Sequence, residues 1–339
     1  MTMKNMSYTF FRHIAILMFS AIFFSSCSEK EYSIPEGGAD LQNDVIKRSL
    51  GPNLVGLDIE FAYAMALPKQ KGKILWAQVE ASIAGGEETY LENKSYYTHS
   101  GSDEINGGTD VGVVIGKPSE NQGAKTIVNF SRDTSAATLR YFYDVPEQAR
   151  GKKVEFTFTA KSSDGSTVSY KMGPYQIAVM DMVLNLEASD NQACYLSIKD
   201  MTFYSAAQAA TRPQEIDLVY LYRGELNSFG HALVSPGADR QYLPQVDLPT
   251  GLSRSTKMRR EFGLRDQQLG NPKYGIYIDD VDFQQLDVSD SPNYALNLKE
   301  EAGAWLETQD GTYRAYVFVN KIDNAGAKAT LSMKRYKLK

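Results

Sequence analysis

The strict alternation of apolar and polar side chains along residues 153–160 most constrains the fold of this chain. In the run KVEFTFTA, apolar residues stand at every second position, with charged or hydroxylated residues between them. Asp164-Gly165 follows, and residues 167–172 alternate in the same way. A period of two indicates strands with one buried face, and Asp-Gly is a favoured hairpin turn. The segment therefore predicts a β-hairpin that packs one face against a hydrophobic core.

The same pattern recurs in the preceding part of the chain. Leu139, Tyr141, Tyr143 and Val145 fall on one side of the run before the hairpin, and residues 73–84, KILWAQVEASIA, are another strand candidate. Short strands separated by turns are typical of β-sandwiches. With 42% hydrophobic residues, the chain has enough apolar side chains to build such cores. We therefore expect a mainly β protein.

A second β-rich domain with few short helices is expected to begin near residue 184. Residues 193–205 and 215–223 have the pattern of strands, and they flank a short helix that Pro213 helps to end. Asp310-Gly311 marks a late hairpin, and a further helix is expected near residues 293–303. The expected organisation is two β-sandwich-type domains in tandem, at residues 41–183 and 184–339.

The closing run ATLSMKRYKLK alternates as a strand and carries four basic residues, Lys334, Arg335, Lys337 and Lys339. Charged side chains on an edge strand protect it from pairing with other chains. We therefore expect this strand to lie at the edge of a sheet. A patch that binds an anionic ligand is the alternative interpretation.

The amino end has the features of a bacterial secretion signal. Lys4 and Arg12 precede the apolar run Ile14–Phe24, which is much shorter than the about 20 residues that a membrane-spanning helix needs. Small residues then precede Cys27 in FSSC, which resembles the bacterial lipobox. The resemblance implies that residues 1–26 are cleaved and that Cys27 carries the lipid anchor. An ordinary signal peptide with a chance cysteine is the alternative.

Residues 27–40 are expected to form a flexible tether behind the anchor. The acidic residues and lysine directly after Cys27 resemble the surface-export signal of Bacteroidota lipoproteins. More than one acyl chain is needed for stable anchoring, and a lipobox cysteine receives several. We therefore expect a protein that is attached to the outer membrane by lipid and faces the cell surface.

Charge and cysteine content exclude some functions. The chain carries 36 basic and 41 acidic side chains, and two of the basic ones leave with the leader. A nucleic-acid partner, which requires a basic face, is not expected. Cys27 and Cys194 are the two cysteines of the chain, so lipidation of the first leaves no intramolecular disulfide. Cys194, in the apolar run ACYLSI, is expected to be a small buried hydrophobic residue.

Longer phrases of the chain resemble a known family. The runs YLSIKDMTFYSAAQAATRPQEIDLVYLY and WLETQDGTYRAYVFVN resemble a module of Bacteroidota lipoproteins, and residues 145–166 resemble their Ig-like first domains. Nearly the whole mature chain resembles one family of Bacteroides lipoproteins of similar length, catalogued only as a domain of unknown function. The resemblance implies tandem β-sandwiches, the first Ig-like, and it supplies no catalytic residues.

Residue types that serve catalysis show no complete motif. A zinc site would need both His99 and His231 together with carboxylates. Ser235 stands in LVSPG, which lacks the first glycine of a hydrolase nucleophile elbow. We therefore expect a protein that is not an enzyme and has no cofactor.

Asp279, Asp280 and Asp282 in YIDDVDF are the candidate metal ligands. Three neighbouring carboxylates suit Ca²⁺, which prefers six to eight oxygen ligands, although the run does not match an EF-hand loop. A solvated strand end is the plainer interpretation. A third interpretation is that two of these acids act as the catalytic pair of a glycosidase.

Exposed aromatic rings are the candidate ligand contacts. Tyr96 and Tyr97 stand beside a glycine-rich loop, whereas Trp76 and Trp305 lie in strand patterns and are expected in the cores. Aromatic rings bind the apolar C–H faces of sugars. The resulting hypothesis is a non-enzymatic binding module for an extracellular glycan, a surface polymer or a protein partner. The alternative is a structural component, either a fimbrillin-like subunit or an accessory subunit of an outer-membrane complex.

Replacing Cys27 with Ala should abolish lipidation, because the thiol is the attachment atom. Intact-mass analysis should find acyl mass on the wild-type protein and none on Cys27→Ala. Protease added to intact cells should remove the anchored protein from their surface. Wild-type protein without acyl mass would refute the anchor, and acylated protein that resists the protease would lie on the periplasmic side.

Overall fold

The computed structural model describes residues 40–99, 109–226 and 228–339. The predicted leader, Cys27 and the predicted tether up to residue 39 lie outside the described residues. Among the described residues, no helix is both long enough and apolar enough to cross a membrane.

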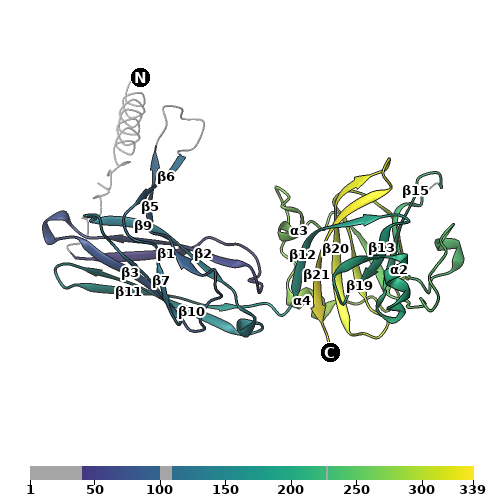
Figure 1. Cartoon of the computed structure of the whole chain (residues 1–339), viewed down its shortest axis with the longest axis horizontal. Helices are drawn as coiled ribbons and strands as arrows, with labels where there is room; N and C mark the ends of the chain where they lie inside the picture. The colour runs from purple at the N-terminus through teal and green to yellow at the C-terminus, as the bar shows by residue number, and fades with distance from the viewer. Residues whose placement is uncertain (1–39, 100–108, 227) are drawn as a thin grey trace, which may run out of the picture. The chain divides into compact units, whose positions relative to one another are not determined.

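The first domain consists of two antiparallel sheets and a separate hairpin (Figure 1). One sheet has the order β1 (Gln42–Lys47), β2 (Asp58–Ala66), β9 (Ala136–Asp144) and β4 (Tyr90–Leu91). The other has the order β11 (Thr167–Gln176), β10 (Lys153–Ser162), β3 (Ile74–Ala81), β8 (Lys125–Asn129) and β7 (Glu120–Gln122). The hairpin pairs β5 (Lys94–His99) with β6 (Thr109–Val114).

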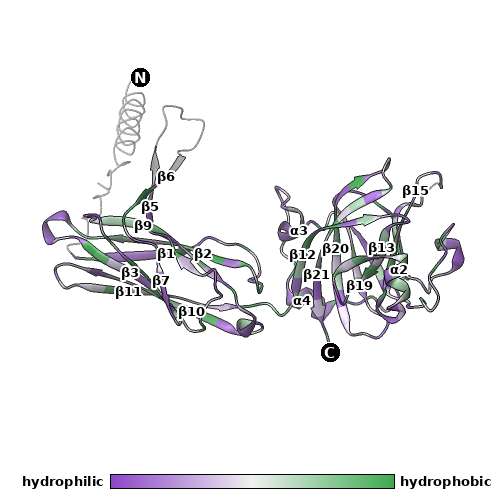
Figure 2. Ribbon diagram, viewed as in Figure 1, coloured by the Kyte–Doolittle hydropathy of each residue, from purple (hydrophilic) through white to green (hydrophobic). Residues whose placement is uncertain are grey.

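Alternate residues of these strands fill one core, as the sequence pattern predicts. Phe61 of β2 packs against Phe156 and Phe158 of β10, with ring centroids 4.8 and 5.3 Å apart. The turn at Asp164-Gly165 joins β10 to β11. The predicted core residues of β9 and β10 are buried, namely Leu139, Tyr141, Tyr143, Val145, Val154, Phe156, Phe158 and Ala160. Figure 2 shows hydrophobic residues along the strands and hydrophilic residues at many of the turns.

The second domain is also built from two antiparallel sheets. One has the order β12 (Asp181–Ser189), β21 (Lys328–Lys337), β20 (Tyr313–Asp323), β19 (Ala302–Glu307) and β17 (Lys257–Phe262). The other has the order β14 (Thr202–Ser205), β13 (Ala193–Ser197), β15 (Leu218–Arg223), β16 (Gly230–Val234) and β18 (Tyr294–Leu298). The prediction of two mainly β, sandwich-type domains in tandem is confirmed.

Short helices connect the strands of the second domain. The predicted helix is α2 (Ala206–Ala210), which Ser205 and Gln208 begin with a capping box. Two more are α3 (Gln267–Gly270) and α4 (Asp280–Gln285). The helix expected near residues 293–303 was a wrong prediction, because β18 and the start of β19 occupy that segment.

Two predictions about core residues are confirmed and one is wrong. Trp305 is buried against Tyr316, with ring centroids 4.7 Å apart. Cys194 is a buried free thiol, and burial raises its pKa to about 11. Trp76 is only half-buried, because Ala77 rather than Trp76 points into the core from β3.

The expected domain boundary at 183/184 falls inside β12, so it must be placed earlier. β12 begins at Asp181 and pairs with β21, a strand of the second domain. Asp181 is partnered with Arg335, and Val183 with Met333. The strand therefore belongs wholly to the second domain.

The basic closing strand is not at an edge, and this corrects the prediction. β21 lies between β12 and β20. The Lys334 side chain is fully buried, and its ammonium lies 2.7 Å from the Asp266 carboxylate. It also donates to the Gln268 side chain and to the Ile278 carbonyl, both at 2.8 Å. Its three donors are thus used inside the protein, which leaves Lys334 unable to serve a surface patch for anions.

Replacing Lys334 with Met should destabilise the protein strongly, because Asp266 would keep a buried charge without its counterion. Removing one partner of a buried ion pair typically costs about 3–5 kcal/mol. Lys337→Met, on the exposed end of the same strand, is the matched control and should change stability by less than about 0.5 kcal/mol. Urea denaturation measures both, and equal effects of the two variants would contradict this account.

Candidate functional site

The predicted sugar-binding tyrosines do not form one surface. Tyr96 and Tyr97 are consecutive on β5, so their side chains point to opposite faces of the hairpin. The Arg140 guanidinium lies 4.2 Å from the centre of the half-buried Tyr96 ring. Tyr97 is 52% exposed. Of the two tyrosines, Tyr97 is therefore the one whose ring is exposed to solvent.

The predicted metal ligands instead organise the start of α4. Asp279 and Asp282 form a capping box, in which each carboxylate accepts from the other residue's backbone N–H. Asp280 accepts from the N–H groups of Val179 and Met180, at 2.7 and 3.0 Å. In the part of the chain that the structure describes, no group of three or more Asp, Glu, His or Cys residues is placed to hold a metal ion. The run is therefore the start of a helix and not a strand end.

The residues considered for catalysis have structural contacts. The Ser235 hydroxyl is buried and donates to the Thr256 carbonyl at 2.8 Å, so it is not presented as a nucleophile. The His99 side chain lies outside what the structure describes. His231 is 3% exposed and lines a surface hollow.

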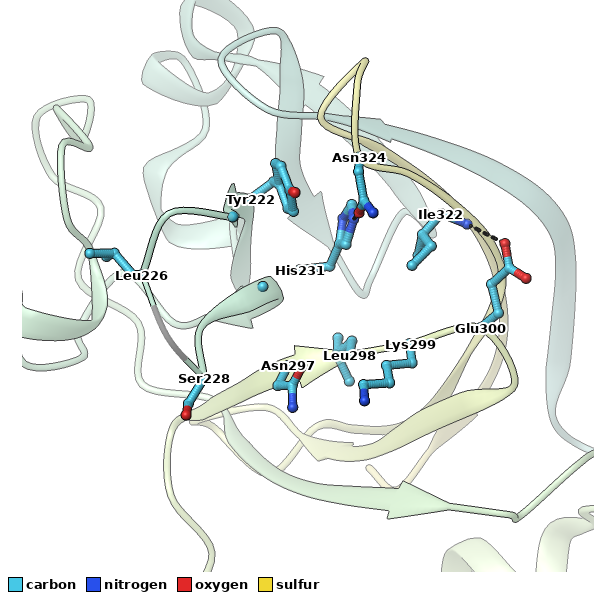
Figure 3. Close-up of a pocket in the computed structure, with 12 residues that line it drawn as sticks. Tyr222, Leu226, Ser228, His231, Asn297, Leu298, Lys299, Glu300, Ile322 and Asn324 are labelled. Atoms are coloured by element: carbon cyan, nitrogen blue, oxygen red, sulfur yellow. Dashed lines mark hydrogen bonds between the residues drawn. The ribbon is translucent and has the colours of Figure 1, made fainter.

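This hollow, which we call the Asn297 hollow, is the candidate functional site. Its volume is about 690 Å³, within the about 300–1,000 Å³ of small-molecule sites. Figure 3 shows Tyr222, His231 and Asn324 on one side, facing Asn297, Leu298 and Lys299 on the other. The remaining lining residues are Gly224, Leu226, Ser228, Gly230, Glu300 and Ile322.

Three strands of one sheet and a hairpin of the other build the Asn297 hollow. Tyr222 on β15 is the cross-strand partner of His231 on β16, which in turn pairs with Leu298 on β18. Asn324 lies in the turn between β20 and β21. The residues of this site are therefore far apart in the sequence and meet only through strand pairing.

A bulge in β18 positions Asn297. The pairing of β16 with β18 skips from His231↔Leu298 to Leu233↔Ala295, which leaves an extra residue on β18. Asn297 takes a left-handed backbone with φ 54°. Asn adopts this conformation more readily than most residues, and bulges often redirect a side chain near functional sites.

The loop that faces the bulge has the same unusual backbone. Ser228 and Gly230 line the hollow with φ values of 70° and 56°. The Asn297 N–H donates to the Phe229 carbonyl at 2.7 Å, which fixes the loop to the bulge. Left-handed conformations at residues other than glycine are unfavourable and concentrate at functional sites. Two residues other than glycine that line the hollow, Ser228 and Asn297, therefore have this conformation.

Hydrogen bonds occupy both ring nitrogens of His231. Nε2 donates to Asn324 Oδ1 at 2.8 Å, and Nδ1 accepts from the Tyr220 hydroxyl at 2.6 Å. The Tyr222 ring stacks on the imidazole, with centroids 4.3 Å apart. Burial lowers the pKa of His231 below its ordinary value, and the neighbouring Asp323 opposes this only in part. The imidazole is thus a neutral support for Tyr222 and Asn324, with no free nitrogen for proton transfer.

The charged side chains of the hollow differ in how they are held. Glu300 accepts a hydrogen bond from the Ile322 N–H at 3.1 Å (Figure 3). The Lys299 side chain is exposed and has no hydrogen bond or ion pair to the described residues. The lining therefore offers one carboxylate, one ammonium, two amides and the hydroxyls of Tyr222 and Ser228.

Comparison with known proteins identifies the family. Residues 38–177 match the model of a domain of unknown function, DUF4466, and residues 178–338 match that of another, DUF8576. A crystal structure of a DUF4466 family protein from Parabacteroides merdae is 45% identical, with a TM-score of 0.82. It covers 89% of this chain and 100% of its own. The chain belongs to the DUF4466 family.

The Parabacteroides relative belongs to the Bacteroidota, which is the group that the resemblance in the sequence implies. The family models meet between residues 177 and 178, in agreement with the position of β12. The major pilin subunit of Bacillus cereus also matches over 85% of this chain and 63% of its own, but with 7% identity and a TM-score of 0.27. This likeness is too weak to support an argument. No protein of curated function matches.

Sequence reasoning missed the Asn297 hollow. Its lining residues form no short motif, because Tyr222, Asn297 and Asn324 come from three separate segments. The available signals were weak: Gly and Ser between residues 224 and 230, and an Asn interrupting the alternation of YALNL. Neither signal indicates a site until the strand order is known.

The contribution of His231 to protein stability should become less favourable as the pH decreases from about 7 to 5. The unfolded chain takes up a proton near pH 6.5, whereas the folded state resists it because the pKa of buried His231 is lower. Each pKa unit by which the folded and unfolded states differ changes the free energy of unfolding by about 1.4 kcal/mol. Urea denaturation across this range should show that the free energy of unfolding of wild type, relative to that of His231→Gln, decreases as the pH falls. Parallel profiles of wild type and His231→Gln would contradict the prediction.

Proposed function

We propose that this DUF4466 protein is a non-enzymatic binding module that captures an extracellular glycan and is anchored to the outer membrane through Cys27. The proposal depends on one observation, the polar lining of the Asn297 hollow. Sugar hydroxyls both donate and accept hydrogen bonds, and the amides of Asn297 and Asn324 do the same. The faces of aromatic rings attract the C–H groups of a sugar, and Tyr222 borders the same space.

The surroundings of the lining support binding rather than turnover. Tyr222 and Asn324 are both held by His231, through ring stacking and a hydrogen bond. A site whose polar groups are held in place before the ligand arrives loses less entropy on binding. Because His231 has no free nitrogen and Ser235 is buried, neither is positioned to attack a ligand. This is the basis for proposing a protein that binds and releases its ligand unchanged.

The alternative of a subunit that polymerises by strand donation has less support. The closing strand β21 is hydrogen-bonded on both sides, to β12 and to β20. Its Lys334 is fixed to Asp266. A donated strand must leave its own sheet, and releasing this one would expose a buried ion pair.

The mature chain with Cys27→Ala should bind at least one saccharide on a glycan array, with affinity measurable by calorimetry. Asn297→Gly should weaken that binding about tenfold, or about 1.4 kcal/mol, because it removes the amide while glycine accepts the left-handed backbone. Asn271→Gly is the control, since Asn271 is an exposed left-handed residue that does not line the Asn297 hollow. Tyr97→Ala tests the exposed ring of β5 in the same assay.

An array without any bound saccharide, alongside a stable protein complex from cell-surface extracts, would refute the glycan proposal. Equal weakening by Asn297→Gly and Asn271→Gly would refute the location of the site. Polymers of the purified protein in electron micrographs would instead favour the structural alternative.

A further inference from the structure

A second hollow adjoins the Asn297 hollow and shares its wall. We call it the Arg260 hollow; it has a volume of about 550 Å³ and is lined by segments of β17, β18 and the residues before β18. Ser228 and Asn297 line both hollows. Asn297 therefore borders both hollows, and we refer to the two hollows together as the groove.

Cations predominate along this groove. Arg260 is exposed, donates to the Leu296 carbonyl, and stacks on Phe262 with the guanidinium 4.5 Å from the ring centre. It has no carboxylate partner among the described residues. Lys299 is likewise without a carboxylate partner there. These two positive charges remain available to a ligand.

The other charged side chains of the groove offset only part of the positive charge of Arg260 and Lys299. Arg259 pairs with Glu261 at 3.0 Å and donates to the Asp287 carbonyl at 2.9 Å. Glu300 is the one carboxylate that lines either hollow, and it already accepts from the Ile322 N–H. Two cations without carboxylate partners therefore face one engaged carboxylate. This local excess of positive charge stands out on a chain of net charge −5.

We propose that the groove binds acidic saccharides, with Lys299 and Arg260 holding a carboxylate or sulfate group of the sugar. The inference rests on the glycan-binding function proposed above and specifies its ligand class. Hydrogen bonds between oppositely charged groups are about twice as strong as neutral ones. A guanidinium held by the Leu296 carbonyl and the Phe262 ring retains N–H groups for an oxyanion. The amide of Asn297, between the two cations, would contact the sugar ring that bears the acid.

The test compares matched pairs of probes on the mature chain with Cys27→Ala. Oligogalacturonate is compared with neutral oligogalactose, and chondroitin sulfate oligosaccharides with their desulfated forms, by calorimetry at low and high salt. We expect the acidic member of at least one pair to bind at least tenfold more tightly, with an advantage that shrinks as salt increases.

Variants then locate the charge contact. Lys299→Gln should weaken the binding of the acidic probe at least fivefold and leave the binding of a neutral probe unchanged. Lys273→Gln removes the same charge from an exposed lysine that lines neither hollow, and it should have no effect. Thermal unfolding of both variants checks that the fold is retained.

The two proposals fail in different ways. If neutral and acidic probes bind equally and Lys299→Gln changes neither, the glycan function stands and the preference for acidic ligands is overturned. If the acidic probe binds but Lys299→Gln and Lys273→Gln weaken it equally, the assignment to this groove is overturned. If no saccharide of any pair or of the array binds, both proposals fall.

Discussion

The fully buried ion pair between Lys334 and Asp266 is the interaction on which the second domain depends most. A charged group in a hydrophobic interior is strongly unfavourable unless it is paired and hydrogen-bonded. Asp266 meets this requirement for Lys334 and at the same time accepts from the N–H groups of Gln268, Leu269 and Ile278. One carboxylate thus links the interior strand β21, the start of α3 and the segment before α4. The aromatic cluster of Phe283, Trp305 and Tyr316 packs in the same part of the domain.

The groove depends on a different constraint, the irregular pairing at the end of β16 and β18. A regular ladder would alternate side chains between core and solvent without interruption. The bulge at Asn297 breaks that alternation once, so an amide faces the groove between the buried Ala295 and Leu298. The His231 ring lies beside the bulge and holds Tyr222 and Asn324. A rigid sheet therefore supports the polar groups, although several of them belong to turns.

Local patterns in the sequence predicted local structure well. The hairpin turns at Asp164-Gly165 and Asp310-Gly311, the buried faces of β9 and β10, and the short helix α2 all follow from neighbouring residues. Errors arose where partners far apart in the chain decide the outcome. Lys334 and Arg335 have the composition of an edge strand, but the position of β21 depends on its pairing with β12, about 150 residues earlier. Asn297 matters only because β18 pairs with β16, and no short window of sequence contains that information.

The pairing of β12 with β21 has a consequence for how such a domain can be combined with others. Asp181, near its beginning, lies opposite Arg335, near its end, so the chain enters and leaves the domain at one corner of one sheet. Units whose two ends lie close together tolerate insertion and fusion, because neither connection must cross the core. The groove is built wholly from residues inside those ends. A domain of this design can be exchanged as one piece, together with its binding surface, which agrees with the separate family models that match the two parts of the chain.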